Sequence, residues 1–327
     1  MAFELKTAHS RDGTKIAFYQ IGTGPGIIIL HGAMQHGLSH MDLAKALSEN
    51  FTCYLPDRRG RGKSGPTGRD YSIQKEVEDV EAIHLVTGAK FLFGVSSGAL
   101  ITLRAALAAP PSHIRRIAVF EPPWRPEADR EAMTAWVQRY HAEIDRGELA
   151  KAAVTTMLGT EMGLAIFRSK YFPQGALVLL AKVLLAFEQH TTGHNNSNNK
   201  PNSKDSSPSD GEQQYAGPLI KDLIPTVRND IEIAMSMLGE ESLQKLAAIQ
   251  TETLILGGSR SQAYLKNAVH ELERTLPNAV RVEFDGLDHG ATFNKAQHGS
   301  PDVFAAELRR FFSQGNDEAA QGNASPP

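Results

Sequence analysis

Residues 91–100 read FLFGVSSGAL, and this stretch decides the fold class. The first three residues form an apolar run typical of a buried strand, and the small residues at its end favour a helix. Between them lies Gly94-Val-Ser-Ser-Gly98, a G-x-S-x-G turn with Ser96 at its centre. Such a turn admits little beyond hydrogen at its flanking positions, and the helix N-terminus favours developing negative charge. The stretch therefore predicts a nucleophile elbow that presents Ser96.

Strand and helix patterns alternate on both sides of this turn. Asp-Gly at residues 12–13 predicts a hairpin, and the unbroken apolar run at 27–30 suits a strand covered on both faces. Predicted strands cover 3–9, 15–21, 27–30, 51–55, 91–95, 117–120, 253–256 and 280–284. Predicted helices cover 38–48, 73–86, 99–108, 128–144, 175–188, 264–276 and 303–312. The alternation predicts an α/β fold with a mostly parallel central sheet and helices on both faces.

The chain also divides by composition into a core and an insertion. We expect the first part of the core at 1–123, a helical cap insertion at 124–241, the second part of the core at 242–314 and a flexible tail at 315–327. Within the cap, residues 190–214 predict a disordered loop because they carry almost no apolar side chains to bury. The apolar run at 175–187 is too short to span a bilayer and predicts a lid or pocket helix.

The bulk composition favours a small-molecule partner. Of the 327 residues, 41% are hydrophobic and 22% charged, and the formal net charge is −3. This balance gives no electrostatic reason to expect nucleic acid or an anionic membrane. The N-terminus lacks the pattern of a secretion signal, so we expect a cytoplasmic protein without stable membrane insertion. We expect no cofactor and no metal, and the composition leaves the oligomeric state open.

Cys53 is the single cysteine of the chain. It lies in an apolar run at 51–55, and one cysteine cannot form an intramolecular disulfide. The context predicts a buried structural thiol rather than a nucleophile.

A glycine-containing turn at 31–34, with the sequence His-Gly-Ala-Met, follows the predicted strand at 27–30. A turn in this position can aim a backbone N–H towards the tip of the sheet. We expect the N–H groups of Ala33 and Ser97 to form an oxyanion hole, because backbone donors are fixed before charge develops. His31 itself is expected to be structural.

A second loop, at 57–64, has the sequence DRRGRGKS and superficially matches a phosphate-binding loop. The match fails because Asp57 occupies the position where that motif requires glycine. A tight loop braced by its arginines is predicted instead.

Together these motifs resemble those of the α/β-hydrolase superfamily. The shared elements are His-Gly after the third strand, D-x-R-G-x-G-x-S at 57–64, G-x-S-x-G at 94–98 and a late histidine, His289, after the last strand. Their order and spacing match the family, and the insertion stands where the family carries its variable cap. The resemblance implies that His289 reaches back over the sheet as the general base for Ser96.

The family usually places its acid after the strand predicted at 253–256, but the loop that follows contains neither Asp nor Glu. Glu121 directly follows the preceding strand, and some lipases that resemble this fold carry the acid there. Glu121 is therefore the expected acid, with a structural role at the entry to the cap as its alternative. Asp288 is poorly placed to orient the ring of its neighbour His289, and Asp285 stays open as a further candidate.

The sequence predicts a serine hydrolase that cleaves an ester, thioester or lactone of a small or medium apolar molecule through an acyl-enzyme on Ser96. The same residues could hydrolyse a carbon–carbon bond in a β-diketone. A non-catalytic ligand sensor or interaction protein is the alternative class, and the absent acid after the seventh strand is its best support.

Overall fold

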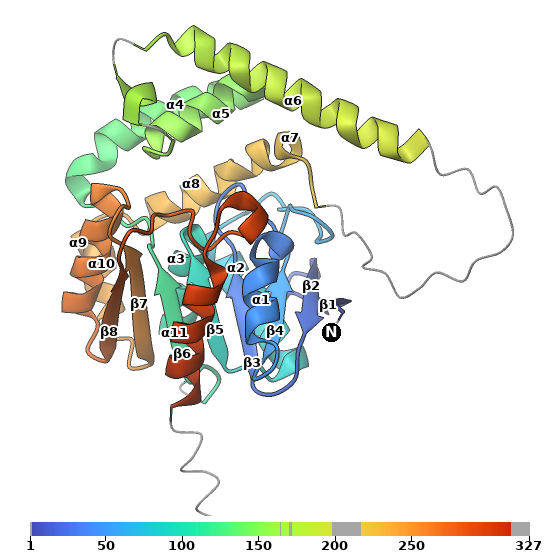
Figure 1. Cartoon of the computed structure of the whole chain (residues 1–327). Coiled ribbons are helices and arrows are strands. Elements are labelled where there is room, and N and C mark those ends of the chain that lie inside the picture. The colour runs from blue at the N-terminus through green and yellow to red at the C-terminus, as the bar shows by residue number, and fades with distance from the viewer. Residues whose placement is uncertain (1, 111, 164, 170–171, 198–216, 315–327) are drawn as a thin grey trace, which may run out of the picture.

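A single twisted sheet forms the centre of the molecule (Figure 1). The computed structural model describes residues 2–110, 112–163, 165–169, 172–197 and 217–314, and within these ranges eight strands form this sheet. The strands are β1 (Glu4–His9), β2 (Lys15–Ile21), β3 (Gly26–Leu30), β4 (Thr52–Pro56), β5 (Phe91–Val95), β6 (Arg116–Phe120), β7 (Glu252–Gly258) and β8 (Ala279–Phe284). Their spatial order is β1-β2-β4-β3-β5-β6-β7-β8. β2 pairs antiparallel with β1 and β4, and the other pairs are parallel.

Helices cover both faces of the sheet, as predicted. The core helices are α1 (Met41–Leu47), α2 (Ile73–Thr87), α3 (Ser97–Ala108), α9 (Glu240–Leu246), α10 (Ala263–Thr275) and α11 (Pro301–Ser313). Successive side chains of β3 point to opposite faces, so Ile27 and Ile29 pack with α1 and α11, while Ile28 and Leu30 pack with α2 and α3. Because β3 is buried on both faces, its sequence is continuously apolar.

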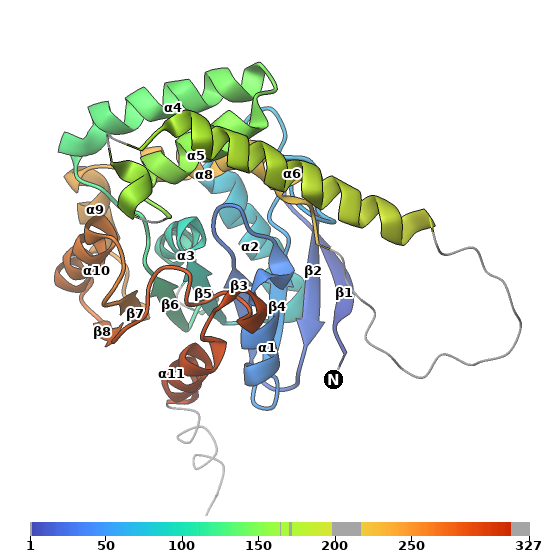
Figure 2. The same cartoon turned by 45° about the horizontal axis from the view of Figure 1, so that its top comes forward.

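Five helices lie over the carboxyl ends of the strands (Figures 1 and 2). In the described part of the chain they are α4 (Arg130–Asp145), α5 (Leu149–Gly159), α6 (Gln174–Ser197), α7 (Ile220–Leu223) and α8 (Val227–Ser236). Short 3₁₀ turns occur at η1 (Gly37–His40), η2 (Glu127–Asp129), η3 (Ala165–Arg168), η4 (Ile224–Thr226) and η5 (Lys295–Gln297). In Figure 1, α8 lies between the sheet and the outer helices α4 and α5, and it contacts both α3 and α4. The exact limits of the insertion, 124 and 241, stay a prediction.

The first residues of the predicted loop at 190–214 are helical in the structure. α6 continues to Ser197, because a helix that has formed extends at low cost where no proline interrupts it, and the next proline is Pro201. The remainder of that loop and the predicted tail at 315–327 lie outside the described residues. Over the described ranges, no helix is both long enough and apolar enough to cross a bilayer.

Candidate active site

The predicted elbow lies between β5 and α3, where the strand order of the sheet reverses around β3. Ligands of open α/β sheets bind at such a reversal, outside the carboxyl ends of the strands. Ser96 has φ 54° and ψ −123°, a conformation that L residues rarely adopt. The two flanking glycines permit it: a Cβ at Gly94 would lie 2.4 Å from the carbonyl oxygen of Gly98, and a Cβ at Gly98 would lie 2.3 Å from that of Leu30.

The Gly98→Ala substitution is expected to lower the free energy of unfolding by about 2–3 kcal/mol, because the backbone of β3 must move to admit the methyl group. Urea denaturation would measure the loss. Gly175→Ala is the matched control: this glycine is in α6 with open space around it, so the change should be neutral or slightly stabilising. Equal stability of the two variants would contradict the packing described for the elbow.

Glu121 and His289 are brought together across the top of the sheet. Glu121 directly follows β6 with φ 47°, and its side chain is fully buried. Its Oε2 accepts a hydrogen bond of 2.6 Å from Nδ1 of His289, and its Oε1 accepts one of 2.7 Å from the backbone N–H of Gly258. The imidazole also stacks on the ring of Phe120. With Nδ1 donating to the carboxylate, Nε2 of His289 is left as the basic nitrogen.

Asp285 and Asp288, the other candidates for the acid, have different partners. The carboxylate of Asp285 accepts a hydrogen bond of 3.1 Å from the hydroxyl of Ser259. That of Asp288 accepts one of 2.9 Å from the backbone N–H of Gly290. The geometry therefore favours Glu121 as the residue that orients His289.

The turn after β3 packs directly against the elbow. A Cβ at Gly32 would lie 2.9 Å from the Cβ of Ser96, so only glycine permits this approach. The N–H of Gly32 donates to Oε1 of Gln35 at 2.6 Å, and Met34 takes φ 58° in the same turn. Ala33 and Ser97, the predicted oxyanion donors, both line the cavity above Ser96. Ser97 is the first residue of α3, so its N–H has no acceptor within the helix.

His31 is buried and supports this turn, in agreement with its predicted structural role. Its Nδ1 lies 2.9 Å from the carbonyl oxygen of Gly32, and its Nε2 accepts the N–H of Arg58 at 3.3 Å. Burial, reinforced by the charges of Arg61 and Arg58, lowers the pKa of His31 well below its ordinary value. The neutral ring fits the two contacts, with Nδ1–H as the donor to Gly32.

A cluster of buried charges between the elbow and α8 was missed by the sequence analysis. Asp230 of α8 accepts hydrogen bonds from the guanidinium groups of Arg58 and Arg61 and from the hydroxyl of Ser97. Burial by itself would raise the pKa of Asp230, but the two guanidinium groups hold it below the usual range. A signal was present: Asp230 shares one face of α8 with Val227 and Ile231, at a spacing where an apolar residue is expected.

The arginines of the loop at 57–64 brace it as predicted, because Arg58, Arg59 and Arg61 form buried ion pairs with acids of other elements: Glu76, Asp79 and Asp230. The carboxylate of Asp57 accepts hydrogen bonds from the N–H groups of Gly37 and Lys63, at 2.9 and 2.8 Å. A Cβ at Gly62 would lie 2.1 Å from this carboxylate.

Cys53 in β4 is buried, and burial raises the pKa of its thiol to about 12, as expected for a structural thiol.

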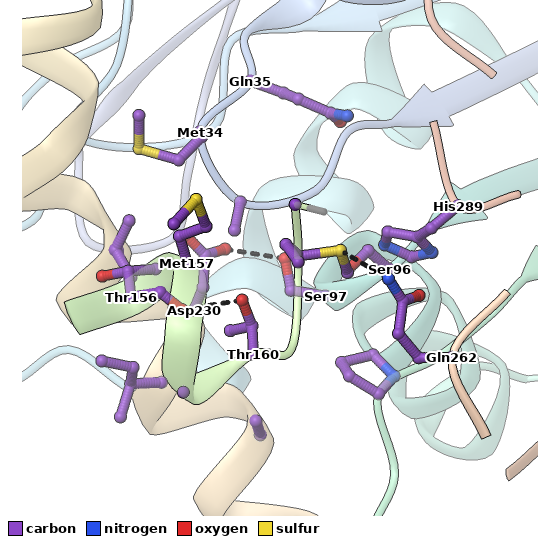
Figure 3. A pocket seen from close by; sticks show the side chains of 18 of the residues that line it. Met34, Gln35, Ser96, Ser97, Thr156, Met157, Thr160, Asp230, Gln262 and His289 are labelled. Carbon is purple, nitrogen blue, oxygen red and sulfur yellow. Dashed lines mark hydrogen bonds between the residues drawn. The ribbon is translucent and has the colours of Figure 1, made fainter. Parts of the chain in front are cut away.

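A cavity of about 740 Å³ extends from Ser96 and His289 to the overlying helices (Figure 3). Its lining is mainly apolar and includes methionines and aromatic residues from both parts of the chain: Met34, Met133, Trp136, Met157, Met162, Phe167, Tyr264 and Phe293. The described residues of α6 are not among the lining residues, so the pocket alternative predicted for 175–187 was wrong, whereas its role as a lid stays a prediction. Its apolar residues instead pack partly on α5 and are partly exposed, as at Leu179 and Phe187.

His40 joins the turn after β3 to the loop that carries His289, since its Nδ1 lies 2.9 Å from the carbonyl oxygen of Thr292. Burial lowers its pKa from 6.5 to about 4, so the folded protein keeps this ring neutral where the unfolded chain protonates it. The neutral His40 ring therefore contributes to the free energy of unfolding above pH 6.5, and this contribution is lost as the pH falls from 6.5 towards 4. Between pH 7 and 4.5 the wild type should lose about 2 kcal/mol more unfolding free energy than His40→Gln, measured by urea denaturation. Identical pH dependences would contradict this.

The comparisons with known proteins agree with this architecture. A family model described as the alpha/beta hydrolase family matches residues 27–307. An alpha/beta hydrolase from Sphaerobacter thermophilus is similar in structure, with a TM-score of 0.66 and 28% identity over 94% of this chain and 100% of that one. An esterase from Exiguobacterium antarcticum has a TM-score of 0.60 at 17% identity, covering 95% and 99% of the two chains, and this likeness concerns the fold alone.

One curated relative also matches over part of its length. It is cis-3-alkyl-4-alkyloxetan-2-one decarboxylase of Shewanella oneidensis, 30% identical over 77 residues. The match spans 23% of this chain and 24% of that relative. The family model, in contrast, covers most of the sequence and confirms the resemblance seen in the motifs, including the expectation of a hydrolase. The chain belongs to the alpha/beta hydrolase family.

Proposed function

We propose that the protein is a serine hydrolase that cleaves carboxylic esters, thioesters or lactones of small or medium apolar molecules, with Ser96, His289 and Glu121 as its catalytic triad. The observation that carries this proposal is the 2.6 Å hydrogen bond between Nδ1 of His289 and the buried carboxylate of Glu121. Through this bond Glu121 serves as the acid partner of His289, although the loop after β7 contains neither Asp nor Glu. This weakens the main argument for a non-catalytic sensor.

In the proposed reaction, Oγ of Ser96 attacks the substrate carbonyl while Nε2 of His289 takes its proton. The tetrahedral oxyanion accepts hydrogen bonds from the N–H groups of Ala33 and Ser97. The C–O or C–S bond then breaks, and the imidazolium returns the proton to the leaving group. Water, deprotonated by the same histidine, releases the acid and regenerates Ser96.

The cavity supports an apolar substrate. Its lining offers methionines, which fill irregular space and adapt to ligands of different shape, beside aromatic side chains. A volume of about 740 Å³ holds a molecule of moderate size, with its reacting carbonyl at the end near Ser96. We expect medium-chain esters to be turned over faster than acetate esters.

Lactones deserve a place among the substrates tested, because the curated relative is named for an oxetan-2-one, a four-membered lactone. Attack by Ser96 on such a ring would break its acyl C–O bond and leave a β-hydroxyacyl ester on the serine. Hydrolysis would then give the β-hydroxy acid. Release of carbon dioxide instead would indicate the chemistry named for that relative.

Reaction with a fluorophosphonate probe tests the proposal. Phosphonylation is expected on Ser96, located by peptide mass spectrometry, together with loss of turnover of p-nitrophenyl esters. Ser96→Ala should abolish the adduct, whereas Ser97→Ala should keep it, because the hydroxyl of Ser97 is held by Asp230. Folded wild-type protein that fails to react would sink the enzyme hypothesis and favour a ligand sensor.

A further inference from the structure

The carboxylate of Asp230, in the overlying helix α8, contacts Ser97 on one side of the proposed oxyanion hole and reaches the turn on the other side through Arg61. Oδ1 of Asp230 accepts a hydrogen bond of 2.7 Å from the hydroxyl of Ser97. Its Oδ2 accepts one of 2.5 Å from Nη2 of Arg61. The same guanidinium donates through Nη1 to the carbonyl oxygen of Gly32 at 2.8 Å. Figure 3 shows the bond from Ser97 to Asp230. A chain of hydrogen bonds thus runs from α8 to the two segments that supply the oxyanion donors.

The contact with Gly32 bears directly on Ala33, because the carbonyl of Gly32 and the N–H of Ala33 belong to one peptide unit. In a planar trans peptide these two groups point in opposite directions. A guanidinium that holds the carbonyl on one side therefore aims the N–H to the other, and its charge polarises the peptide into a better donor. Nδ1 of His31, the residue before Gly32 in the turn after β3, lies 2.9 Å from the same carbonyl oxygen.

The contact with Ser97 acts at the start of α3. Its hydroxyl is anchored to Asp230, and Nη1 of Arg58 lies 3.2 Å from the same hydroxyl. Fixing this side chain fixes the first residue of the helix, whose N–H is the proposed oxyanion donor. The side chains of Arg58, Arg61 and Asp230 are 1%, 0% and 6% exposed, so water does not compete for these bonds.

We propose that Asp230 is a positioning residue that aims both oxyanion donors, Ala33 through Arg61 and Ser97 directly. This inference rests on the proposed function. It follows that the oxyanion hole is complete only while α8 is docked on the core. The charges balance locally, since Arg58 also pairs with Glu76 at 2.8 Å, so Asp230 adds no uncompensated negative charge beside the developing oxyanion.

An alkyl trifluoromethyl ketone tests this arrangement. Ser96 Oγ adds to the ketone carbon, His289 takes the proton, and the resulting hemiketal anion occupies the oxyanion hole. Asp230→Asn and Arg61→Met should raise the inhibition constant about thirtyfold and lower kcat for a p-nitrophenyl ester to a similar degree, with KM changed less than about threefold. Ser97→Ala, which removes one hydroxyl, should change both quantities by about threefold to tenfold. The double variant Asp230→Asn/Arg61→Met should be little worse than either single variant.

Arg59→Met is the matched control. Arg59 is an equally buried arginine of the same loop, but it pairs with Asp79 and Asp12. Its loss should lower the melting temperature and leave the inhibition constant within twofold of wild type. A merely structural role for Asp230 predicts the same behaviour in the Asp230 and Arg61 variants.

These measurements distinguish a failure of the positioning role from a failure of the proposed function. Unchanged inhibition constants in folded Asp230→Asn and Arg61→Met, or an equal rise in Arg59→Met, would overturn the positioning role while leaving the proposed function intact. If those two variants do not fold, Ser97→Ala decides, and an unchanged constant there overturns the proposal. Wild-type protein that forms no hemiketal on Ser96 would overturn the proposed function itself, and this inference with it.

Discussion

Replacing His289 with alanine should lower kcat for a p-nitrophenyl ester by on the order of 10⁴–10⁶, with little change in KM. Without the imidazole, Ser96 keeps its proton and is a poor nucleophile at neutral pH. Since the two residues act as one unit, Ser96→Ala and the double variant should show about the same residual rate as His289→Ala. Steady-state kinetics on the three variants checks this.

His298→Asn is a suitable control for that series. His298 is an exposed histidine of the neighbouring turn with φ 64°, a conformation that asparagine tolerates. Its rate should match that of the wild type. A His289→Ala variant that kept more than a tenth of wild-type turnover, beside an inactive Ser96→Ala, would assign the general base to another residue.

Glu121→Gln should lower kcat by about a hundredfold or more. The amide keeps the shape of the side chain but cannot stabilise the imidazolium, and its NH₂ group can impose the wrong tautomer on His289. In serine proteases the corresponding change costs about 10⁴ in kcat, so even a partial analogue should lose two orders of magnitude. KM should change little, because the carboxylate is buried away from the substrate. Rates would be measured alongside melting curves.

Asp285→Asn and Asp288→Asn are the matched comparison for Glu121→Gln. Both carboxylates accept hydrogen bonds from other groups, so each variant should retain turnover within a fewfold of wild type. A loss below about tenfold for Glu121→Gln, next to a large loss for one aspartate, would move the assignment to that aspartate. Small losses in all three would indicate a pair of Ser96 and His289 that works without a carboxylate.

The sequence was sufficient for the parts of the fold that depend on local patterns. The elbow at 94–98 was recognisable because its glycines meet a strict steric demand, and the strand before it because burial on both faces leaves only apolar side chains. Glu121 and His289 were named from the resemblance, which implies an acid and a histidine after the strands that became β6 and β8; the carboxyl ends of these parallel strands lie at one edge of the sheet.

The contacts of Asp230 could not be predicted in the same way. They join α8 to residues more than a hundred positions earlier in the chain, and only the packing of the helix decides which side chains meet. The course of α6 was missed for a related reason. Composition suggested a loop from residue 190, but composition does not show where a helix that has already formed will end.

The position of the proposed acid on β6 has a consequence for how such a protein can change over generations. Gly258, the last residue of β7, donates its main-chain N–H to the carboxylate of Glu121. Gln262 and Tyr264, which follow it, face the cavity instead. Substitutions at these two positions, in nature or in a saturation library, can therefore change which ligands bind while the hydrogen bond between Glu121 and His289 is kept. If the loop after β7 carried the acid itself, the same substitutions would put that bond at risk.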